Sequence, residues 1–405
     1  MMEKRPQNGP KITGRRVRGA LAVTAVAALV VGCGSSTKES TSSDATTHAA
    51  NSAAASPASS SNPAIGVVGT KAVYTTVGPT GQTAVAATTL QLTPAEVAAL
   101  RKGRYTAAIA MHEPATFTSA VVAGADAEFA KLGVSVVAST DANGSATTQV
   151  NQLQTIQAKH PTAVVSIPFD PATEASAYKA LSASGSKLVF LSNVPSGMQY
   201  PSQYAGMVTD DLANMGKQAA ILLGTAMHGQ GDAAMIYYDA AFYVTNERDA
   251  SFRSWLRKLY PNIHLVAQEG FADPSTVQTV ASAMLQRNPN LNGIYVSWST
   301  PPADGVLAAL RNVGTSGQVK VVTDDLDPSI DGGLVKGQYL AGIVADQPYL
   351  LGETLAKEAG LAILGKQVPS FSVVKAIPVT RSNLLNTWRA TLNQAPPAAI
   401  VNAYH

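Results

Sequence analysis

Short apolar runs alternate with longer segments of helical periodicity along most of the chain, from residue 105 onward. The apolar runs lie at residues 105–111, 134–139, 163–167, 187–192, 233–238, 262–268, 292–297, 320–324 and 339–344. Segments such as 119–133, 146–160 and 172–185, in which apolar residues recur at helical spacing, lie between them. Apolar strands that alternate with helices predict parallel sheets covered on both faces. The chain is therefore expected to be an α/β protein.

The number of strand–helix units predicts two sheets rather than one. About ten units are more than one typical doubly wound sheet holds. We place the boundary near Asp210–Asp211, where a strand-like run passes into a long helical segment. A single (β/α)₈ barrel is the alternative, but the count exceeds the eight units that such a barrel contains.

A helix start precedes the first of these strands. Thr93 stands at the N-cap position, Pro94 at the first helical position and Glu96 at the position that completes a capping box. The globular body is expected to begin near this helix. Residues 65–92 are rich in glycine and in strand-favouring residues, and their role stays open.

The first 32 residues have the pattern of a secretory signal. Residues 1–20 hold six basic residues and one acidic residue, and residues 21–32 are uncharged and almost all apolar. This apolar run is too short to span a bilayer, which needs about 20 residues. The pair Arg15–Arg16 is compatible with a twin-arginine export signal, although the apolar run that follows suits such a signal poorly.

Cys33, the only cysteine of the 405 residues, follows this run directly. The segment VVGC at residues 30–33 resembles a bacterial lipobox. The resemblance implies cleavage before Cys33, which then becomes the acylated first residue. Residues 33–64 are rich in Ser, Thr and Ala and contain no aromatic residue, so they are expected to form a flexible tether.

Removal of the signal changes the charge of the chain. The formal net charge of the whole chain is +3. The leader alone carries +5, so the mature protein has a net charge of −2. No basic patch remains to favour nucleic acid, so no nucleic-acid partner is expected. Because a single cysteine cannot form an intramolecular disulfide, stability must come from a packed core, which a 46% hydrophobic composition can supply.

Candidate ligand-binding residues follow the predicted strands. In open parallel sheets, ligands bind beyond the carboxyl ends of the strands. The loops at these ends hold Glu113, Asn193, Asn246, Glu247, Trp298, Asp325 and Asp346. Carboxylates and amides bind hydroxyl groups, and aromatic rings cover the apolar faces of sugar rings, so this set suits a hydroxyl-rich ligand. Two other acids, Asp211 and Asp327, are interpreted as helix-capping residues.

The sequence shows none of the catalytic motifs that would indicate an enzyme. The chain has no G-x-S-x-G nucleophile motif, no P-loop and no G-x-G-x-x-G after its first strand. Its six histidines show no zinc-ligand spacing, so neither a metal nor a cofactor is expected. His112, at the end of a predicted strand, stays open as a ligand contact. We expect a binding protein rather than an enzyme.

Four stretches carry a resemblance to a known family. They are FTSAVVAGADAEFAKLG from residue 117, VTDDLANMGKQAA from residue 208, TNERDASFRSWL from residue 245, and the long stretch 321–366, which begins VVTDDLDPSIDGG. Together they resemble the periplasmic sugar-binding proteins of ABC importers, of the ribose-binding type. The resemblance covers about two thirds of the chain and lies in the order of landmarks more than in a strict motif.

The resemblance implies a hinged architecture. Two Rossmann-like lobes would be joined by three crossing strands, with crossings near Thr209, Asp346 and Pro378. Residues 105–209 and 347–377 would form lobe 1, and residues 210–346 and 378–405 would form lobe 2. Residues 65–104 would be an N-terminal extension with a lead helix.

The resemblance also implies roles for individual residues. Phe117 falls where a ring-stacking aromatic opens the first helix, and Asp325 matches the aspartate after the VV strand. Asp346 occupies a hinge position often held by Gln. Asp324, Thr118 and the pair Ser192–Asn193 depart from the family pattern, which puts recognition of a simple pentose or hexose in doubt. A polyol, a modified sugar such as a deoxy sugar or furanose, and a small signalling molecule stay open, and segments 243–249 and 297–302 resemble the rhamnose- and autoinducer-binding branch.

The partners implied are a small sugar-like ligand, an ABC permease and the membrane, reached through acylated Cys33. A monomer is expected. A transcriptional repressor with the same two-lobed fold would need an N-terminal helix-turn-helix, where this chain has an export signal. A ligand sensor that feeds a membrane receptor kinase, and a binder of a non-sugar solute, stay open as alternatives.

Overall fold

The computed structural model describes residues 75–314 and 317–405. The predicted signal peptide at 1–32, the lipidation site Cys33 and the tether at 33–64 lie outside the described residues. The described chain contains two separate sheets, which confirms the two-lobed α/β prediction and shows that the barrel alternative is wrong.

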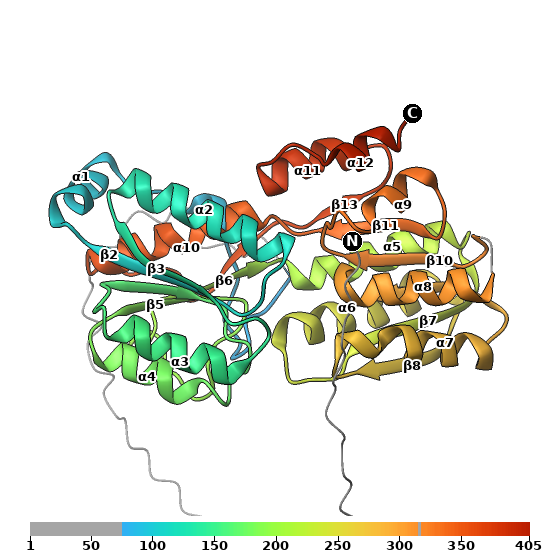
Figure 1. Ribbon diagram of the computed structural model, residues 1–405, viewed down its shortest axis with the longest axis horizontal. Helices are drawn as coiled ribbons and strands as arrows, with labels where there is room; N and C mark the ends of the chain where they lie inside the picture. The colour runs from blue at the N-terminus through green and yellow to red at the C-terminus, as the bar shows by residue number, and fades with distance from the viewer. Residues whose placement is uncertain (1–74, 315–316) are drawn as a thin grey trace, which may run out of the picture. The chain divides into compact units, whose positions relative to one another are not determined.

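The first sheet has seven strands, all of them parallel. In spatial order they are β1 (Val85–Ala86), β12 (Ser372–Val374), β6 (Gly206–Asp210), β5 (Lys187–Leu191), β4 (Ala163–Ser166), β2 (Thr106–Met111) and β3 (Ser135–Asp141). One face is covered by α1 (Pro94–Gly103), α2 (Thr116–Leu132) and α10 (Pro348–Ile363), and the other by α3 (Ala146–Gln157) and α4 (Ala175–Ala183) (Figure 1). This sheet and its helices are called lobe 1.

The second sheet has six strands, parallel except for β13 at one edge. In spatial order they are β13 (Ile377–Val379), β11 (Leu340–Ala345), β10 (Lys320–Asp324), β9 (Leu291–Val296), β7 (Gln230–Tyr238) and β8 (Asn262–Phe271). On one face lie α5 (Leu212–Ala226) and α6 (Tyr243–Leu259), and the other apolar cluster is built from α7 (Val277–Arg287), α8 (Asp304–Val313), α9 (Asp331–Lys336), α11 (Leu384–Leu392) and α12 (Ala398–Asn402). Short helical turns lie at Ala87–Thr89, Pro274–Thr276 and Ser299–Ala303. This unit is called lobe 2.

The chain passes between the two sheets three times. It leaves β6 for α5 at Asp210–Asp211, leaves β11 for α10 at Asp346–Gln347, and leaves β12 for β13 at Lys375–Ala376. Each passage lies within a few residues of the position that the resemblance implied. The domain limits themselves stay a prediction.

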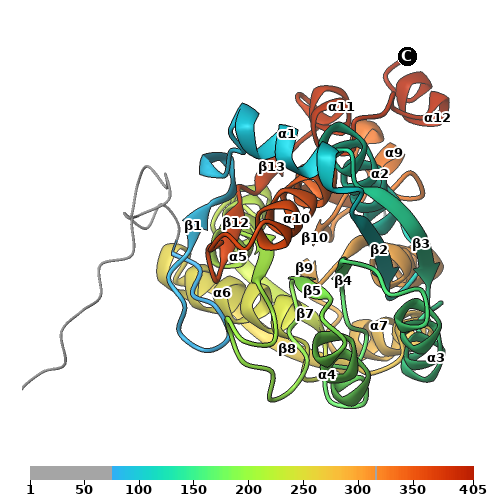
Figure 2. The same cartoon turned by 90° about the vertical axis from the view of Figure 1, so that its left-hand side faces the viewer.

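Residues 75–92, whose role the sequence left open, contact both lobes. Strand β1 pairs in parallel with β12 at the edge of the first sheet (Figure 2). Upstream of it, the Thr76 hydroxyl donates to the Asp211 carboxylate at 2.5 Å and accepts from the Ala213 backbone N–H at 3.0 Å. The first turn of α5 is therefore tied to the N-terminal segment by contacts that no local pattern could predict.

The predicted helix start is confirmed, and one predicted cap is wrong. The Thr93 hydroxyl accepts from the Glu96 backbone N–H, and the Glu96 carboxylate accepts from the Thr93 backbone N–H at 2.8 Å. Asp211 occupies the N-cap position of α5. Asp327 does not cap α9, which has Ile330 as its N-cap residue. Its carboxylate accepts from the Ser329 backbone and from the Thr116 hydroxyl of α2, which joins the two lobes.

Two glycines let α2 and α10 pack closely. A Cβ on Gly352 would clash with the carbonyl oxygen of Val121, and one on Gly124 would clash with that of Tyr349. We expect Gly352→Ala to lower the free energy of unfolding by about 1–3 kcal/mol or more, because neither backbone can yield without separating the helices. Chemical denaturation measures this change.

The matched control is Gly332→Ala in α9, where a Cβ would meet no atom within 4 Å. This variant should keep or slightly raise stability, because alanine favours the helix. Equal stability of the two variants would contradict the close approach of α2 and α10.

Candidate ligand-binding site

Side chains from the carboxyl ends of strands in both lobes lie against one another. The His112 ring, after β2, lies 6.4 Å from the Phe242 ring, which precedes α6 in lobe 2. The Thr116–Asp327 hydrogen bond, 2.9 Å long, also crosses between the lobes. The loops in which the sequence placed candidate ligand residues therefore face one another in space.

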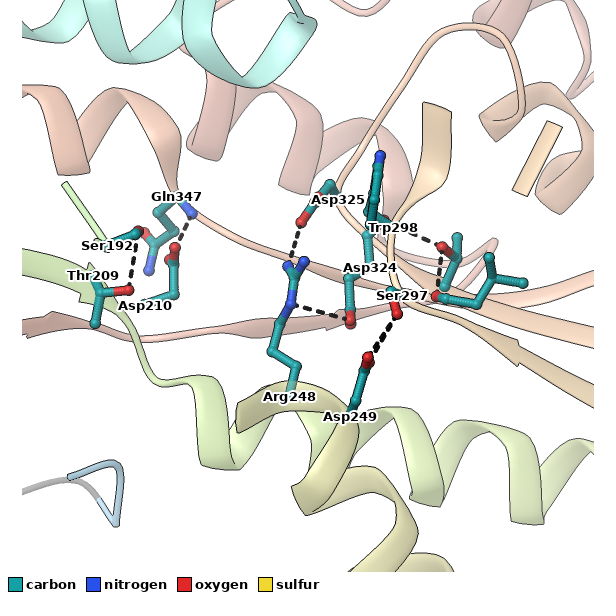
Figure 3. Close-up of polar contacts among 12 residues, drawn as sticks. Ser192, Thr209, Asp210, Arg248, Asp249, Ser297, Trp298, Asp324, Asp325 and Gln347 are labelled. Carbon is teal, nitrogen blue, oxygen red and sulfur yellow. Dashed lines mark hydrogen bonds and ion pairs between the residues drawn. The ribbon is translucent and has the colours of Figure 1, made fainter. Parts of the chain in front are cut away.

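A buried ion pair lies at the centre of these loops (Figure 3). Arg248 projects from α6, where its Nη1 donates to Asp325 Oδ1 at 3.0 Å and its Nε lies 3.6 Å from Asp324 Oδ2. Burial disfavours the guanidinium charge, but Asp325 and Asp324 outweigh it and raise the pKa of Arg248 above its usual value. Arg248 is therefore held as a buried cation between two acids.

The acids around Arg248 outnumber it. Burial raises the pKa of Asp324 to about 8, that of Asp210 to about 7 and that of Asp249 to about 6. Burial also raises the pKa of Asp325 and, much further, that of Asp346, where the neighbouring acids add to the effect. Part of this cluster is consequently protonated near neutral pH, so it offers hydroxyl donors as well as carboxylate acceptors.

Hydroxyl groups hold the inner acids in place. The Tyr295 hydroxyl lies 2.8 Å from Asp324 Oδ2 and 3.0 Å from Asp249 Oδ1. The Ser297 hydroxyl donates to Asp249 at 2.8 Å. Asp324, which departs from the family pattern according to the resemblance, is completely buried, so it acts as an internal partner of Arg248.

The structure brings three of the candidate acids together. Asp346 lies on the passage from β11 to α10, within hydrogen-bonding reach of Asp325. Glu113, after β2 in lobe 1, lies 3.5 Å from His112 Nε2. Burial, followed by the charges of Asp141 and Asp325, raises the pKa of Glu113.

Asn193 follows β5 and is 1% exposed. Both polar atoms of its side-chain amide lack a hydrogen-bond partner within the described part of the chain. The residue before it, Ser192, has a left-handed backbone with φ of 62° and bonds through its hydroxyl to Thr209 at 3.2 Å. A buried, unpaired amide costs about 1–3 kcal/mol, so a ligand that pairs with it gains that amount back.

A row of aromatic rings links the two lobes. Trp298 stands edge-on to Tyr238 at 5.4 Å, and Tyr238 stands edge-on to Phe242 at 6.1 Å. The His112 ring continues the row into lobe 1, where it lies 6.5 Å from Phe169. Burial lowers the pKa of His112 to about 4, so its ring is neutral near pH 7.

Three candidates have other surroundings. Asn246 is exposed, and its amide donates to the Ala240 carbonyl at 3.1 Å, which closes the turn before α6. Glu247 is half-buried beside Tyr243. Phe117 packs partly buried against the apolar cluster beneath α2 and α10. Arg248 is the residue of this turn that reaches the acids, and it lies within the stretch from residue 245 that carries part of the family resemblance.

In residues 75–314 and 317–405, no group of three or more His, Cys, Asp or Glu side chains is arranged to hold a metal ion. Within the same ranges no helix is long and apolar enough to cross a bilayer.

Residues 112–367, more than half of the chain, match a family model described as the periplasmic binding protein domain. The D-allose-binding periplasmic protein of Escherichia coli (strain K12) is 32% identical over 185 residues, which cover 44% of this chain. The alignment spans 54% of that relative, or about half its length.

Solved structures of binding proteins share the fold. A solute-binding protein of Agrobacterium vitis, bound with alpha-D-tagatopyranose, superposes with a TM-score of 0.64 at 20% identity, over 72% of this chain and 99% of that one. A protein of Burkholderia graminis C4D1M, in complex with D-arabinose, superposes with a TM-score of 0.61 at 25% identity, over 69% of this chain and 96% of that one.

Proposed function

This chain belongs to the periplasmic binding protein family, a family of binding proteins rather than enzymes, and from that premise we propose that it is the extracytoplasmic solute-binding component of an ABC sugar importer. It binds a small sugar or sugar-like ligand between its two lobes. The observation that carries the proposal is the set of groups drawn from both lobes: the unpaired Asn193 amide, the Arg248–Asp325 pair and the aromatic row. The sugars bound by the similar proteins support the ligand class.

Binding works as a shift between open and closed forms. Asn193 and Glu113 offer hydrogen bonds from lobe 1, while Asp325 and Arg248 offer them from lobe 2. A ligand that contacts both sets gains all of these bonds only when the lobes are together, so it favours the closed form. Trp298 and Tyr238 supply ring faces and edges for the apolar side of a sugar. The closed form then docks on the permease.

A screen by thermal shift tests the ligand class. The full chain is heated with pentoses, hexoses, 6-deoxy sugars, polyols and amino acids in turn. A ligand that binds only the folded state stabilises it by about 2.7 kcal/mol at a hundredfold excess over Kd, which raises Tm. A shift with one sugar or polyol supports the proposal, and a shift with an amino acid alone overturns the sugar assignment.

Asn193→Leu should separate binding from stability. Since the amide has no partner, we expect the variant to be at least as stable as the wild type, while affinity for the sugar found in the screen falls about 10- to 100-fold. Titration calorimetry and denaturation measure the two quantities. The exposed Asn151→Ala in α3 is the control and should change neither. Unchanged affinity in Asn193→Leu would remove Asn193 from the site.

We also propose that Cys33 is acylated and anchors the protein to the membrane, on the strength of the lipobox resemblance. Cys33→Ser should therefore release the protein from the membrane fraction into the soluble fraction. Fractionation followed by immunoblotting measures this. A variant that stays in the membrane fraction contradicts the lipid anchor and leaves the ligand proposal untouched.

A further inference from the structure

A groove of about 520 Å³ lies beside the charged cluster, between the two lobes and the N-terminal segment. Lobe 1 contributes the loop after β5, which holds Asn193, Tyr200 and Tyr204. Lobe 2 contributes Tyr243 at the start of α6, and the N-terminal segment contributes Gln82. We call this feature the tyrosine groove. Its volume lies in the range of small-molecule sites, roughly 300–1,000 Å³.

Hydrogen bonds hold the walls of the tyrosine groove in place. The Tyr243 hydroxyl donates to the Val77 carbonyl at 2.6 Å, and the Tyr200 hydroxyl donates to the Val368 carbonyl at 2.8 Å. The turn at residues 78–82 is closed by the Gly78 backbone N–H, which donates to the Gln82 carbonyl at 2.9 Å. The two rings and the turn are therefore fixed before any ligand arrives, which lowers the entropy cost of binding.

The lining of the groove suits a neutral ligand with hydroxyl groups. Among the described residues that line it, none is Asp, Glu, Lys or Arg. Asn193 also lines the groove, and its buried side-chain amide has no hydrogen-bond partner among the described residues. The half-buried rings of Tyr200 and Tyr243 provide apolar faces. This combination of ring faces and amides, without charge, is the chemistry that binds sugar rings.

The groove and the charged cluster are connected through neighbouring strand ends of lobe 1. Asn193 lines the groove, and its neighbour Ser192 bonds to Thr209, the residue before Asp210 of the cluster. The cluster is charged and the groove is neutral, so they form two adjoining sites of different character. From this juxtaposition we propose that the tyrosine groove is a second sugar subsite, and that the ligand of this protein is a neutral disaccharide. The inference rests on the proposed function, because it assigns the first ring to the cluster.

The N-terminal segment has a part in this subsite. It forms one wall through Gln82, and Thr76 ties the same segment to α5 of lobe 2. The second ring would thus be enclosed by three parts of the chain, with Asn193 between the two rings.

Filling the groove from its rim tests the proposal. Ser196 and Thr80 are exposed, and both line the groove from different walls. The full chain and its Ser196→Trp and Thr80→Trp variants are titrated with maltose, cellobiose, lactose and sucrose, and with glucose, galactose and fructose. Ser202→Trp is the control, since Ser202 is exposed on the same loop but does not line the groove.

We expect at least one disaccharide to bind ten or more times more tightly than its own monosaccharides. Each groove variant should weaken that disaccharide at least tenfold and change monosaccharide affinity less than twofold, while Ser202→Trp changes neither. Monosaccharide binding with no gain for any disaccharide overturns the second subsite and leaves the proposed function standing. Disaccharide binding that both groove variants leave intact also overturns it. No binding of any sugar overturns both proposals.

Discussion

Arg248→Met is expected to lose about 3–5 kcal/mol of the free energy of unfolding, because it strips a buried acid cluster of its cation. Arg248 is 5% exposed and lies between Asp325 and Asp324, which keep no other cation in contact within the described chain. Methionine fills similar space but supplies no positive charge to Asp325 and Asp324. The variant should also lose sugar affinity, since Asp325 is no longer oriented.

The pH dependence of the loss identifies its cause. Without Arg248 the pKa values of Asp324 and Asp325 should rise further above their unfolded values, so the folded state of the variant binds more protons. Its stability, relative to the wild type, then falls as pH rises and recovers in acid. Urea denaturation of the wild type and the variant at pH 5 and at pH 8 measures the stability difference at the two ends of this pH range.

Two further variants give this experiment its controls. Arg257→Met removes an exposed arginine from the same helix and should cost less than about 1 kcal/mol. The double variant Arg248→Met with Asp325→Asn should recover part of the loss, because one unpaired acid is gone. A loss in Arg248→Met that is independent of pH, with no recovery in the double variant, would mean that packing rather than charge accounts for the effect.

Local patterns in the sequence predicted the fold because each element carries its own signal. The helix expected at 119–133 is α2, and Gly133 ends it with a left-handed φ of 72° as a C-terminal glycine does. Periodicity placed its start at residue 119 and the resemblance at Phe117, one residue after the observed start at Thr116; Ala115 at the N-cap has no capping side chain to mark it. Strand β1 was missed, because it is two residues long and exists only through pairing with β12.

The candidate site was predictable only in part. Asp325 and Asn193 follow apolar strands, so the rule that ligands bind at carboxyl ends predicted them as candidates. Arg248 lies one turn inside a helix, where an arginine usually faces solvent, and only folding shows that it is buried. The pairing of Thr76 with Asp211 spans 135 residues, and no periodicity carries such information.

The free energy of unfolding should fall as pH rises through the range in which Glu358 titrates. Glu358→Gln should abolish the part of this fall that Glu358 causes. Glu358 lies on α10, completely buried, where it accepts from the Ser372 hydroxyl at 2.5 Å. Burial raises its pKa from 4.5 to about 8. The side chain is therefore neutral in the folded protein at pH 6, although it is ionised in the unfolded chain.

The sign of the effect follows from proton binding. Between pH 4.5 and 8 the folded state holds a proton on Glu358 that the unfolded state has released, so each pH unit costs about 1.4 kcal/mol of stability. The protonated Glu358 side chain makes its full contribution to stability below pH 4.5, and this contribution is lost as pH rises to 8. Glutamine keeps an acceptor for Ser372 and cannot ionise. At pH 9 the variant should thus be more stable than the wild type by about 3–5 kcal/mol, and at pH 4.5 nearly equal to it.

Denaturation of wild type and variant across this range isolates Glu358, because the other buried acids contribute equally to both proteins. Asp239→Asn, at an exposed site, is the control and should follow the wild-type curve. Parallel curves for wild type and Glu358→Gln would mean that Glu358 ionises in the folded protein as readily as in the unfolded chain. Lobe 1 would then have to open enough around α10 and β12 for water to reach the carboxylate. Divergent curves would instead establish that the contact between α10 and β12, next to the last passage between the lobes, stays dry in the folded protein.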